Sequence, residues 1–113
     1  MTKLVTAIIK PHMLDAVKDA LQGAGIKGMT VTDVRGFGRQ GGHTETYRGT
    51  EYAVDFIPKI RLDILCVAEQ ADAVVDTIRA TANTGKIGDG KVWVVDVERV
   101  VRNRTGDEGA EAI

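Results

Sequence analysis

The stretch that decides the fold is LVTAII, residues 4–9, which Lys10 and Pro11 follow directly. It is a nearly continuous apolar run rich in β-branched residues, and this pattern is typical of a strand covered on both faces. The run is far shorter than the roughly 20 apolar residues of a membrane-spanning helix, and it lacks the extended apolar core of a signal peptide. It therefore predicts the central strand of a sheet, in a protein that we expect to be soluble and cytoplasmic.

Two segments outside this strand have apolar residues at the three-and-four spacing of a helix with one buried face. The first covers 14–24 and meets Gly25, where a left-handed residue is expected to end the helix. The second covers 71–82 and stops before an Asn-Thr-Gly sequence. Three more stretches are rich in strand formers: 29–34, a part of 52–67, and 92–97.

The resulting order of elements is βαββαβ, with one helix in each half. Two such halves usually bury their apolar faces by placing both helices on one face of a four-stranded antiparallel sheet. The sequence thus predicts an α+β, ferredoxin-like fold with a long loop between the second and third strands. Because strands three and four carry apolar residues on both faces, the uncovered face would expose a large patch, and we expect an oligomer. Coverage of that face by loops is the alternative.

The composition limits the remaining possibilities. A chain of 113 residues with 43% hydrophobic and 27% charged residues suits one globular domain. The 15 Lys and Arg residues nearly balance the 16 Asp and Glu residues, and a net charge of −1 offers no basic field for nucleic acid. Cys66 is the only cysteine and ends an apolar strand, so an internal disulfide is excluded and a buried, inert thiol is expected.

The segment RGFGRQGGHTETYRGTE, residues 35–51, breaks the pattern of strands and helices. It contains several glycines, has no apolar stripe, and is longer than the roughly two to six residues of an ordinary connection. Loops of this length in small domains are mostly functional or mobile, although a tolerated insertion is the alternative. Nothing in the local pattern buries Tyr47, or Tyr52 just beyond the segment, so we expect a surface that another molecule reads.

Three short motifs near these loops do not carry the functions that they usually indicate. Glycines in 36–41 have the dinucleotide-binding spacing G-x-G-x-x-G, but the following residues cannot form the helix that such a site needs. Residues 85–91 match G-x-x-x-x-G-K, but Val92 replaces the Mg²⁺-binding hydroxyl and a strand follows instead of a helix. Residues 35–38 begin like an RNA-recognition motif, but Arg39 and the residue after it stand where the stacking aromatic should be.

What remains is a physical signal for anion binding. Two glycine-rich loops, 38–42 and 84–91, contain cations, and Arg102 and Arg104 lie near the C-terminus. Exposed backbone N–H groups in such loops form anion-binding nests, and Lys and Arg add charge-assisted hydrogen bonds to phosphate oxygens. A nucleoside triphosphate fits this pattern. The sequence shows no arrangement of a nucleophile with a base and no spacing of zinc ligands, so it predicts a binding protein. The alternative is a small ATP-hydrolysing enzyme in which Lys91 is the cation that holds the phosphate.

Seven segments then point to one known family. The most specific are YRGTEY at 47–52 and TGKIGDGK at 84–91. The others are KP at 10–11, GMTV at 28–31, GFGRQ at 36–40, GHTE at 42–45 and RNRTG at 102–106. In this combination the chain resembles, from end to end, the PII nitrogen-regulatory signal-transduction family.

The resemblance implies a homotrimer of single-domain subunits, residues 1–113, that binds ATP or ADP in clefts between neighbouring subunits. Its functional segments would be a long regulatory loop at about 37–55, a phosphate-binding loop at about 82–91 and a C-terminal segment at about 102–113. The nucleotide-binding residues that it implies are Thr30, Gly38, Arg39, Gln40, Gly88, Asp89, Gly90, Lys91, Arg102 and Arg104, the last two reaching in from the adjacent subunit.

The resemblance also implies an effector site that ATP and Mg²⁺ create for 2-oxoglutarate. Gln40 would join the metal ion, Lys59 would pair with a carboxylate of the effector, and the backbone around Gly42 would close over it. This arrangement is chemically sensible, because Mg²⁺ takes oxygen ligands that phosphates and a small carboxylate can share.

The output of such a protein would be its long loop, whose conformations shift with the bound ligands. Tyr52 matches the position that relatives modify with uridylyl or adenylyl groups, and a nucleotidyltransferase is therefore an implied partner. Thr50 sits where some relatives carry a phosphorylated serine. Tyr47 and Arg48 would contact partner proteins, either nitrogen-assimilation enzymes or an ammonium transporter, and any contact with a membrane would be through that transporter. Nucleic acid is not an expected partner.

The chain departs from the usual pattern of the family at three places. Gly41 stands where a lysine is common, which removes a cation from the base of the loop. Asp63 replaces a usual glutamate, which shortens a possible reach toward the nucleotide, and His12 with Met13 replaces a commoner Phe-Lys pair. None of these changes removes a residue named as a ligand above.

Overall fold

The computed structural model describes the whole chain except residues 39–43, 48–49 and 55, and it describes side chains for 1–38 and 56–113. The described residues form two α-helices, six strands and two short 3₁₀ helices. Their order is β1 (Thr2–Ile9), η1 (Pro11–Met13), α1 (Leu14–Gly23), β2 (Thr30–Gly36), β3 (Thr44–Tyr47), β4 (Thr50–Val54), β5 (Ile57–Val67), α2 (Ala68–Ala82), β6 (Lys91–Val97) and η2 (Gly109–Ala112).

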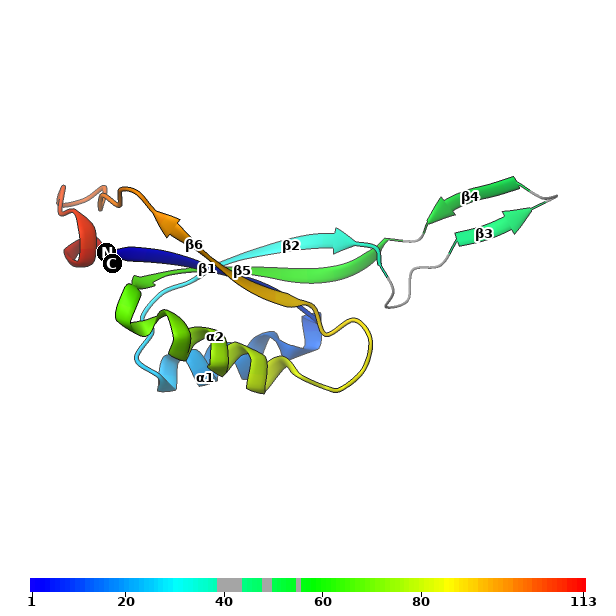
Figure 1. Ribbon diagram of the computed structural model, residues 1–113, viewed down its shortest axis with the longest axis horizontal. Coiled ribbons are helices and arrows are strands. Elements are labelled where there is room, and N and C mark those ends of the chain that lie inside the picture. Colours follow the sequence, from blue (N-terminus) through cyan, green and yellow to red (C-terminus); the bar gives the residue numbers. More distant parts are fainter. Residues whose placement is uncertain (39–43, 48–49, 55) are drawn as a thin grey trace.

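The main sheet has four strands in the order β2-β5-β1-β6, and all of its neighbouring pairs are antiparallel. As the LVTAII run predicted, β1 is central, since it pairs with β5 on one side and β6 on the other. Figure 1 shows both helices on the same face of this sheet. The predicted ferredoxin-like α+β fold is therefore confirmed.

The hydrophobic core lies between this face and the two helices. Alternate residues of β1, namely Val5, Ala7 and Ile9, are at most 1% exposed. Their fully buried partners from β5, α1 and α2 include Leu62, Ile64, Cys66, Val17, Leu21, Val74 and Ile78. Cys66 is a free, buried cysteine, so its predicted burial is confirmed, and this burial raises the pKa of its thiol.

Both helices bury the apolar stripes that the sequence predicted, and α1 ends next to Gly25, as we expected. Gly25 has a φ of 92°, and its N–H donates to the Gln22 carbonyl at 3.0 Å. The N–H of Ile26 donates to the Leu21 carbonyl at 3.0 Å, which closes the helix end over a buried side chain. The second helix begins at Ala68, earlier than its apolar stripe indicated. The three residues before the stripe, Ala68 to Gln70, include two polar side chains and carry no apolar periodicity.

The long segment between β2 and β5, which we predicted as a loop, includes two short strands. It contains a short antiparallel hairpin, β3 and β4, in which Glu45 pairs with Tyr52 and Tyr47 pairs with Thr50. Figure 1 shows this hairpin beyond the end of the main sheet. The predicted third strand within 52–67 is accordingly two strands, β4 and β5. Thr, Tyr and Val residues favour strands, but this segment has no apolar stripe in its sequence, and the search for such a stripe therefore missed both strands.

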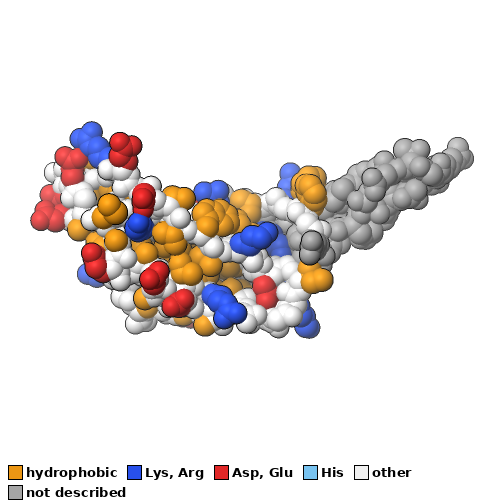
Figure 2. All heavy atoms as spheres, in the orientation of Figure 1, with side chains coloured by type: hydrophobic (Ala, Val, Ile, Leu, Met, Phe, Trp, Pro, Cys, Tyr) orange, Lys and Arg blue, Asp and Glu red, His pale blue; other side chains and the backbone are white. Residues whose placement is uncertain are grey.

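The face of the main sheet opposite the helices remains open in a single chain. Its register places Leu4 between Leu65 of β5 and Val95 of β6, and Trp93 lies beside them on the same face. Leu65, Trp93 and Val95 are 39%, 41% and 46% exposed, so loops do not cover them. Figure 2 shows hydrophobic side chains gathered in the middle of the visible side of the molecule. The predicted second apolar face is therefore present.

Candidate functional site

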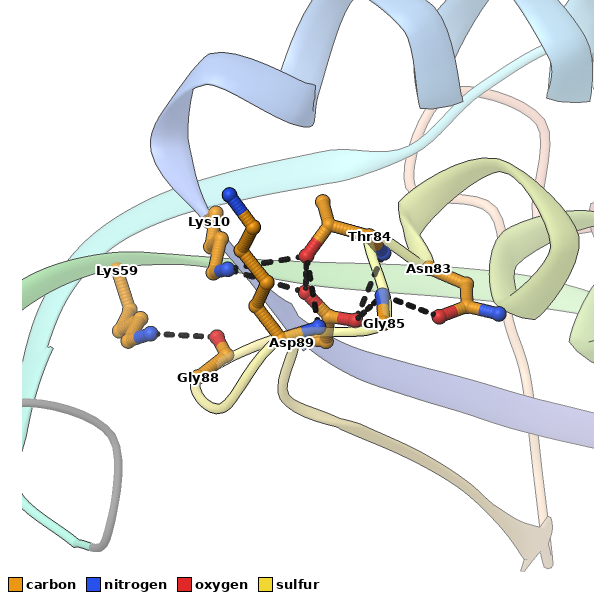
Figure 3. Close-up of polar contacts among 8 residues, drawn as sticks. Lys10, Lys59, Asn83, Thr84, Gly85, Gly88 and Asp89 are labelled. Atoms are coloured by element: carbon orange, nitrogen blue, oxygen red, sulfur yellow. Dashed lines mark hydrogen bonds and ion pairs between the residues drawn. The ribbon is translucent and has the colours of Figure 1, made fainter.

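The loop between α2 and β6 folds around the carboxylate of Asp89 (Figure 3). Asp89 Oδ2 accepts hydrogen bonds from the backbone N–H groups of Thr84, at 2.7 Å, and Gly85, at 3.0 Å. Asp89 Oδ1 accepts one from the Thr84 hydroxyl and forms an ion pair with Lys10 Nζ at 3.1 Å. These hydrogen bonds hold the pKa of Asp89 well below its usual range, and the bond from the Thr84 hydroxyl has the largest effect. Burial of the carboxylate acts in the opposite direction.

Gly90 brings this loop against the end of β1. Its φ is +91°, and a Cβ atom built on it would lie 1.7 Å from the carbonyl oxygen of Ile8. No other residue type fits there, both because of the left-handed backbone and because of the contact. Gly85 and Gly88 also have positive φ values, of 78° and 99°. Loops with several such glycines are typical of backbone that binds an anion, although the N–H of Gly85 itself already donates to Asp89.

Lys59 brings a buried cation to the same place. The residue is 6% exposed, and its ammonium donates a hydrogen bond of 2.6 Å to the Gly88 carbonyl oxygen (Figure 3). Burial lowers the pKa of Lys59, as does the nearby charge of Lys10, while Asp89 acts in the opposite direction. Within the described part of the chain no carboxylate forms an ion pair with Lys59. A buried ammonium of this kind is strongly stabilised by an added anion.

A cleft of about 610 Å³ lies between the loop and the end of β2. Its lining contains six of the predicted ligand residues: Gly38, Lys59, Gly88, Asp89, Gly90 and Lys91. Gly36 and Phe37 line it from the start of the long segment, and Phe37 packs edge-to-face on Phe56 with ring centres 5.5 Å apart. The two ends of the long segment are thus held together beside the cleft.

Thr30 lies elsewhere. It lines a second cavity, of about 720 Å³, together with Asp63, Leu65 and the C-terminal residue Ile113. Thr30 pairs with Asp63 in the sheet, whereas Lys59 pairs with Val34 further along the same two strands. One chain therefore distributes the predicted nucleotide ligands over two separate cavities.

Asp63, one of the departures from the family pattern, is fixed on the open face of the sheet. Its carboxylate accepts hydrogen bonds from the Thr6 hydroxyl at 2.8 Å and from Arg61 Nε at 3.0 Å. The hydrogen bond from Arg61 lowers the pKa of Asp63, Thr6 adds to this effect, and burial opposes it. Asp63 is therefore an ionised acceptor at the edge of the second cavity.

The C-terminal arginines lie in neither cavity lining. Arg102 forms an ion pair with Asp107 at 3.7 Å and donates a hydrogen bond of 3.2 Å to the carbonyl oxygen of Ile113. Arg104 is exposed. The single chain does not bring either residue to the glycine loop.

Several predicted residues lie outside the described part of the structure. They are Arg39, Gln40, Gly42 and Arg48. Tyr47 and Tyr52 have a described backbone, in β3 and β4, but no described side chain. Among the residues that the structure describes, no three His, Cys, Asp or Glu side chains gather as a metal site.

The sequence reasoning missed the contributions of Lys10 and Thr84 to this site. Both lie in segments quoted for the resemblance, but no spacing along the chain indicates that Lys10 reaches Asp89. Only the pairing of β1 with β6 brings the two ends of this ion pair together. Thr6 was missed for the same reason, because its contact with Asp63 depends on the pairing of β1 with β5. Arg61 lies two residues from Asp63 on β5 and was also missed, although both residues lie on one face of that strand.

Comparison with known proteins decides the family. The sequence model of the family described as nitrogen regulatory protein P-II matches residues 2–107. The chain belongs to the P-II family. A nitrogen regulatory protein P-II from Pasteurella multocida is 60% identical over 111 residues, which is 98% of this chain and 99% of the relative. Nitrogen regulatory protein P-II 1 from Escherichia coli K12 is also 60% identical, over the same shares of the two chains.

The solved structures agree with the P-II assignment. A crystal structure of Arabidopsis thaliana PII bound to citrate superimposes with a TM-score of 0.80 at 37% identity, covering 98% of this chain and 88% of that one. The names of the family and of these relatives denote a regulatory protein of nitrogen metabolism and not an enzyme, in agreement with the prediction from the sequence. In the described part of this P-II chain, no helix has the length and apolar character needed to cross a membrane.

Proposed function

We propose that this P-II protein senses adenine nucleotides, ATP or ADP, and, with Mg²⁺ and ATP, the dicarboxylate 2-oxoglutarate. The observation that carries the proposal is the buried ammonium of Lys59 beside the glycine loop of Gly88 and Gly90. Lys91, exposed at the start of β6, adds a second cation to the lining of the same cleft. This donor set fits phosphate and carboxylate oxygens, which accept hydrogen bonds from N–H groups and ammonium groups.

The residues would divide the ligands between them. Gly38, Gly88, Gly90 and Lys91 would hold the phosphates, and Lys59 would pair with a carboxylate of 2-oxoglutarate. Arg39, Gln40 and Gly42 complete the proposed set, with Gln40 as the protein ligand of Mg²⁺. When bound, Mg²⁺ supplies positive charge that phosphate and carboxylate oxygens share. The protein's own part is to orient these oxygens and to exclude water from Lys59.

A homotrimer would complete this site. Thr30 and the cleft at Gly88 lie in different cavities of one chain, so a nucleotide that contacts both must lie between two copies. The exposed apolar face at Leu65, Trp93 and Val95 supports such an assembly, because a monomer rarely leaves a contiguous patch of this kind in water. Arg102 and Arg104 would reach the nucleotide from the neighbouring subunit.

The long segment would carry the signal. Gly36, Phe37 and Gly38 line the cleft and also begin this segment, so a ligand there makes different contacts in different conformations of the segment. We propose that nitrogen-assimilation enzymes or an ammonium transporter bind through Tyr47 and Arg48, and that a nucleotidyltransferase modifies Tyr52. The protein would act in the cytoplasm and would meet a membrane only through a transporter partner.

Calorimetric titration with ATP tests the nucleotide part of the proposal. We expect saturable binding, and at least about a tenfold weaker dissociation constant for Lys91→Met, because one charge-assisted contact is lost. Lys3→Met is the matched control, since Lys3 pairs with Asp96 at the far end of β1 and β6. Absence of ATP binding, or equal losses in both variants, would contradict the proposal.

A further inference from the structure

We propose that Lys10, Thr84 and Asp89 form a clasp that holds the phosphate loop in its anion-binding shape, with Asp89 as a positioning residue and not as a ligand of the nucleotide. The inference deepens the proposed function and rests on it, because it concerns how the loop of 84–91 is prepared for phosphates. It changes the role of Asp89, which the resemblance had placed among the nucleotide-binding residues.

The first argument is the occupancy of the Asp89 carboxylate. A carboxylate offers about four acceptor sites. Oδ2 receives the N–H groups of Thr84 and Gly85 at 2.7 and 3.0 Å, and Oδ1 receives the Thr84 hydroxyl and, at 3.1 Å, the ammonium of Lys10. All of these donors belong to the protein, so the side chain is already satisfied. A phosphate placed against it would meet an anion and no free donor.

The second argument is where the clasp connects. Lys10 follows the last residue of β1, and its ammonium also donates to Thr84 Oγ1 at 3.2 Å. The same hydroxyl oxygen accepts the N–H of Lys86 at 3.2 Å. Thr84 thus joins the start of the loop to Asp89 near its end and to the central strand. Figure 3 shows these groups converging from the loop and from the strand.

The third argument is the geometry that the clasp maintains. Gly85, Gly88 and Gly90 all have positive φ values, and glycine is the residue that loses the most conformational freedom when it is ordered. A loop with three such residues needs external contacts to hold one shape. The clasp supplies such contacts at Thr84, Gly85 and Asp89, and the hydrogen bond from Lys59 to the Gly88 carbonyl supplies another.

The clasp and a carboxylate of Asp89 that faces the phosphates predict opposite signs for one substitution. If the carboxylate faced the phosphates, Asp89→Asn would remove a repulsive charge and tighten the binding of an anion. If it is the centre of a clasp, the amide replaces an acceptor by a donor that faces the N–H groups of Thr84 and Gly85, and the loop loosens. The clasp therefore predicts weaker binding in this variant.

The experiment measures binding of ATP and of inorganic triphosphate, both without divalent metal, to the full-length protein. We expect Asp89→Asn to weaken both probes by about tenfold, the effect of losing a charged hydrogen bond. Thr84→Val should weaken both to a similar degree, and Thr84→Ser, which keeps the hydroxyl, should restore binding to within about twofold. Asp72→Asn, on the exposed face of α2, is the control for net charge and should bind as the wild type does.

A coupling measurement separates the clasp from direct contacts. If Lys10 acts through Asp89, the variant Lys10→Met with Asp89→Asn should bind no more weakly than the weaker single variant. Circular dichroism shows which variants fold, and if Asp89→Asn does not fold, the comparison of Thr84→Val with Thr84→Ser decides. Tighter or unchanged binding in Asp89→Asn, or failure of Thr84→Ser to rescue, overturns the clasp alone. A wild-type protein that binds neither probe overturns the proposed function and the clasp with it.

Discussion

The ammonium of Lys59 donates a hydrogen bond of 2.6 Å to the carbonyl oxygen of Gly88 and so connects β5 to the loop before β6. Both residues belong to the proposed ligand set, Lys59 for a carboxylate and Gly88 for phosphates. A ligand that binds to either residue therefore changes the hydrogen bond between Lys59 and Gly88, and this change reaches the other residue. This relationship gives the proposed coupling between nucleotide and effector a physical route, and linkage requires that the coupling be reciprocal.

Replacement of Gly90 should distort the site more than replacement of a neighbouring glycine. A methyl group on Gly90 would overlap the Ile8 carbonyl oxygen, whereas nothing lies within 4 Å of the corresponding position on Gly85. Both residues have positive φ, so both Ala variants incur backbone strain of roughly 1 kcal/mol or more, and only Gly90→Ala adds the overlap. We expect Gly90→Ala to lower the free energy of unfolding by about 1–3 kcal/mol more than Gly85→Ala does. Urea denaturation of the two variants measures the difference, and equal losses would be inconsistent with the close approach to β1.

A charge on the open face of the sheet should prevent assembly. Leu65→Glu places a carboxylate among Leu4, Trp93 and Val95, where a subunit contact would bury it without a partner. We expect sedimentation velocity to find a particle of three chains for the wild type and a single chain for this variant. Val31→Glu is the control, because Val31 has a similar exposure, 44%, but pairs with Leu62 on the other face. A wild-type monomer, or dissociation of both variants, would refute the assignment of this face.

Acid should destabilise the protein partly through Asp63. The hydrogen bond from Arg61 lowers the pKa of Asp63 in the folded state relative to the unfolded chain. The stability from this group is therefore fully present above the unfolded pKa of about 4 and is lost as pH falls through the lower folded value. Asp63→Asn should make the free energy of unfolding less dependent on pH below about 4 than it is in the wild type. Exposed Asp72→Asn serves as the control, and an unchanged pH dependence in Asp63→Asn would show that the Arg61 contact contributes nothing.

Modification of the long segment should depend on one tyrosine. With a nucleotidyltransferase and its nucleotide substrate, the wild type should gain one nucleotidyl group per chain, which intact-mass spectrometry detects. Tyr52→Phe should abolish this gain and leave ATP binding unchanged, while Tyr47→Phe, in the paired strand of the hairpin, should keep it. A modified Tyr52→Phe protein would place the site elsewhere.

Most of the fold could be predicted because its signals are local. The apolar run of β1, the stripes of the two helices and the position of Gly25 all reflect residues near one another in sequence. The hairpin of β3 and β4 was missed because its strands are only four and five residues long and lack the apolar alternation that periodicity detects. The start of α2 was missed for a similar reason.

The candidate site was predictable as a set of residues but not as an arrangement. The glycine loops and cations indicated an anion site, and Gly88, Gly90, Lys91 and Lys59 do line one cleft. The ion pair of Lys10 with Asp89 depends on strand pairing and has no signature in the sequence. The separation of Thr30 from this cleft likewise follows from its place along β2, which only the register reveals.

Calorimetric titration of 2-oxoglutarate into the wild-type protein, with and without Mg²⁺ and ATP, tests the central claim most directly. We predict saturable binding only when both Mg²⁺ and ATP are present, and loss of that binding in Lys59→Met while ATP itself still binds. Binding of 2-oxoglutarate that is the same with and without Mg²⁺ and ATP, or that survives unchanged in Lys59→Met, would contradict the account.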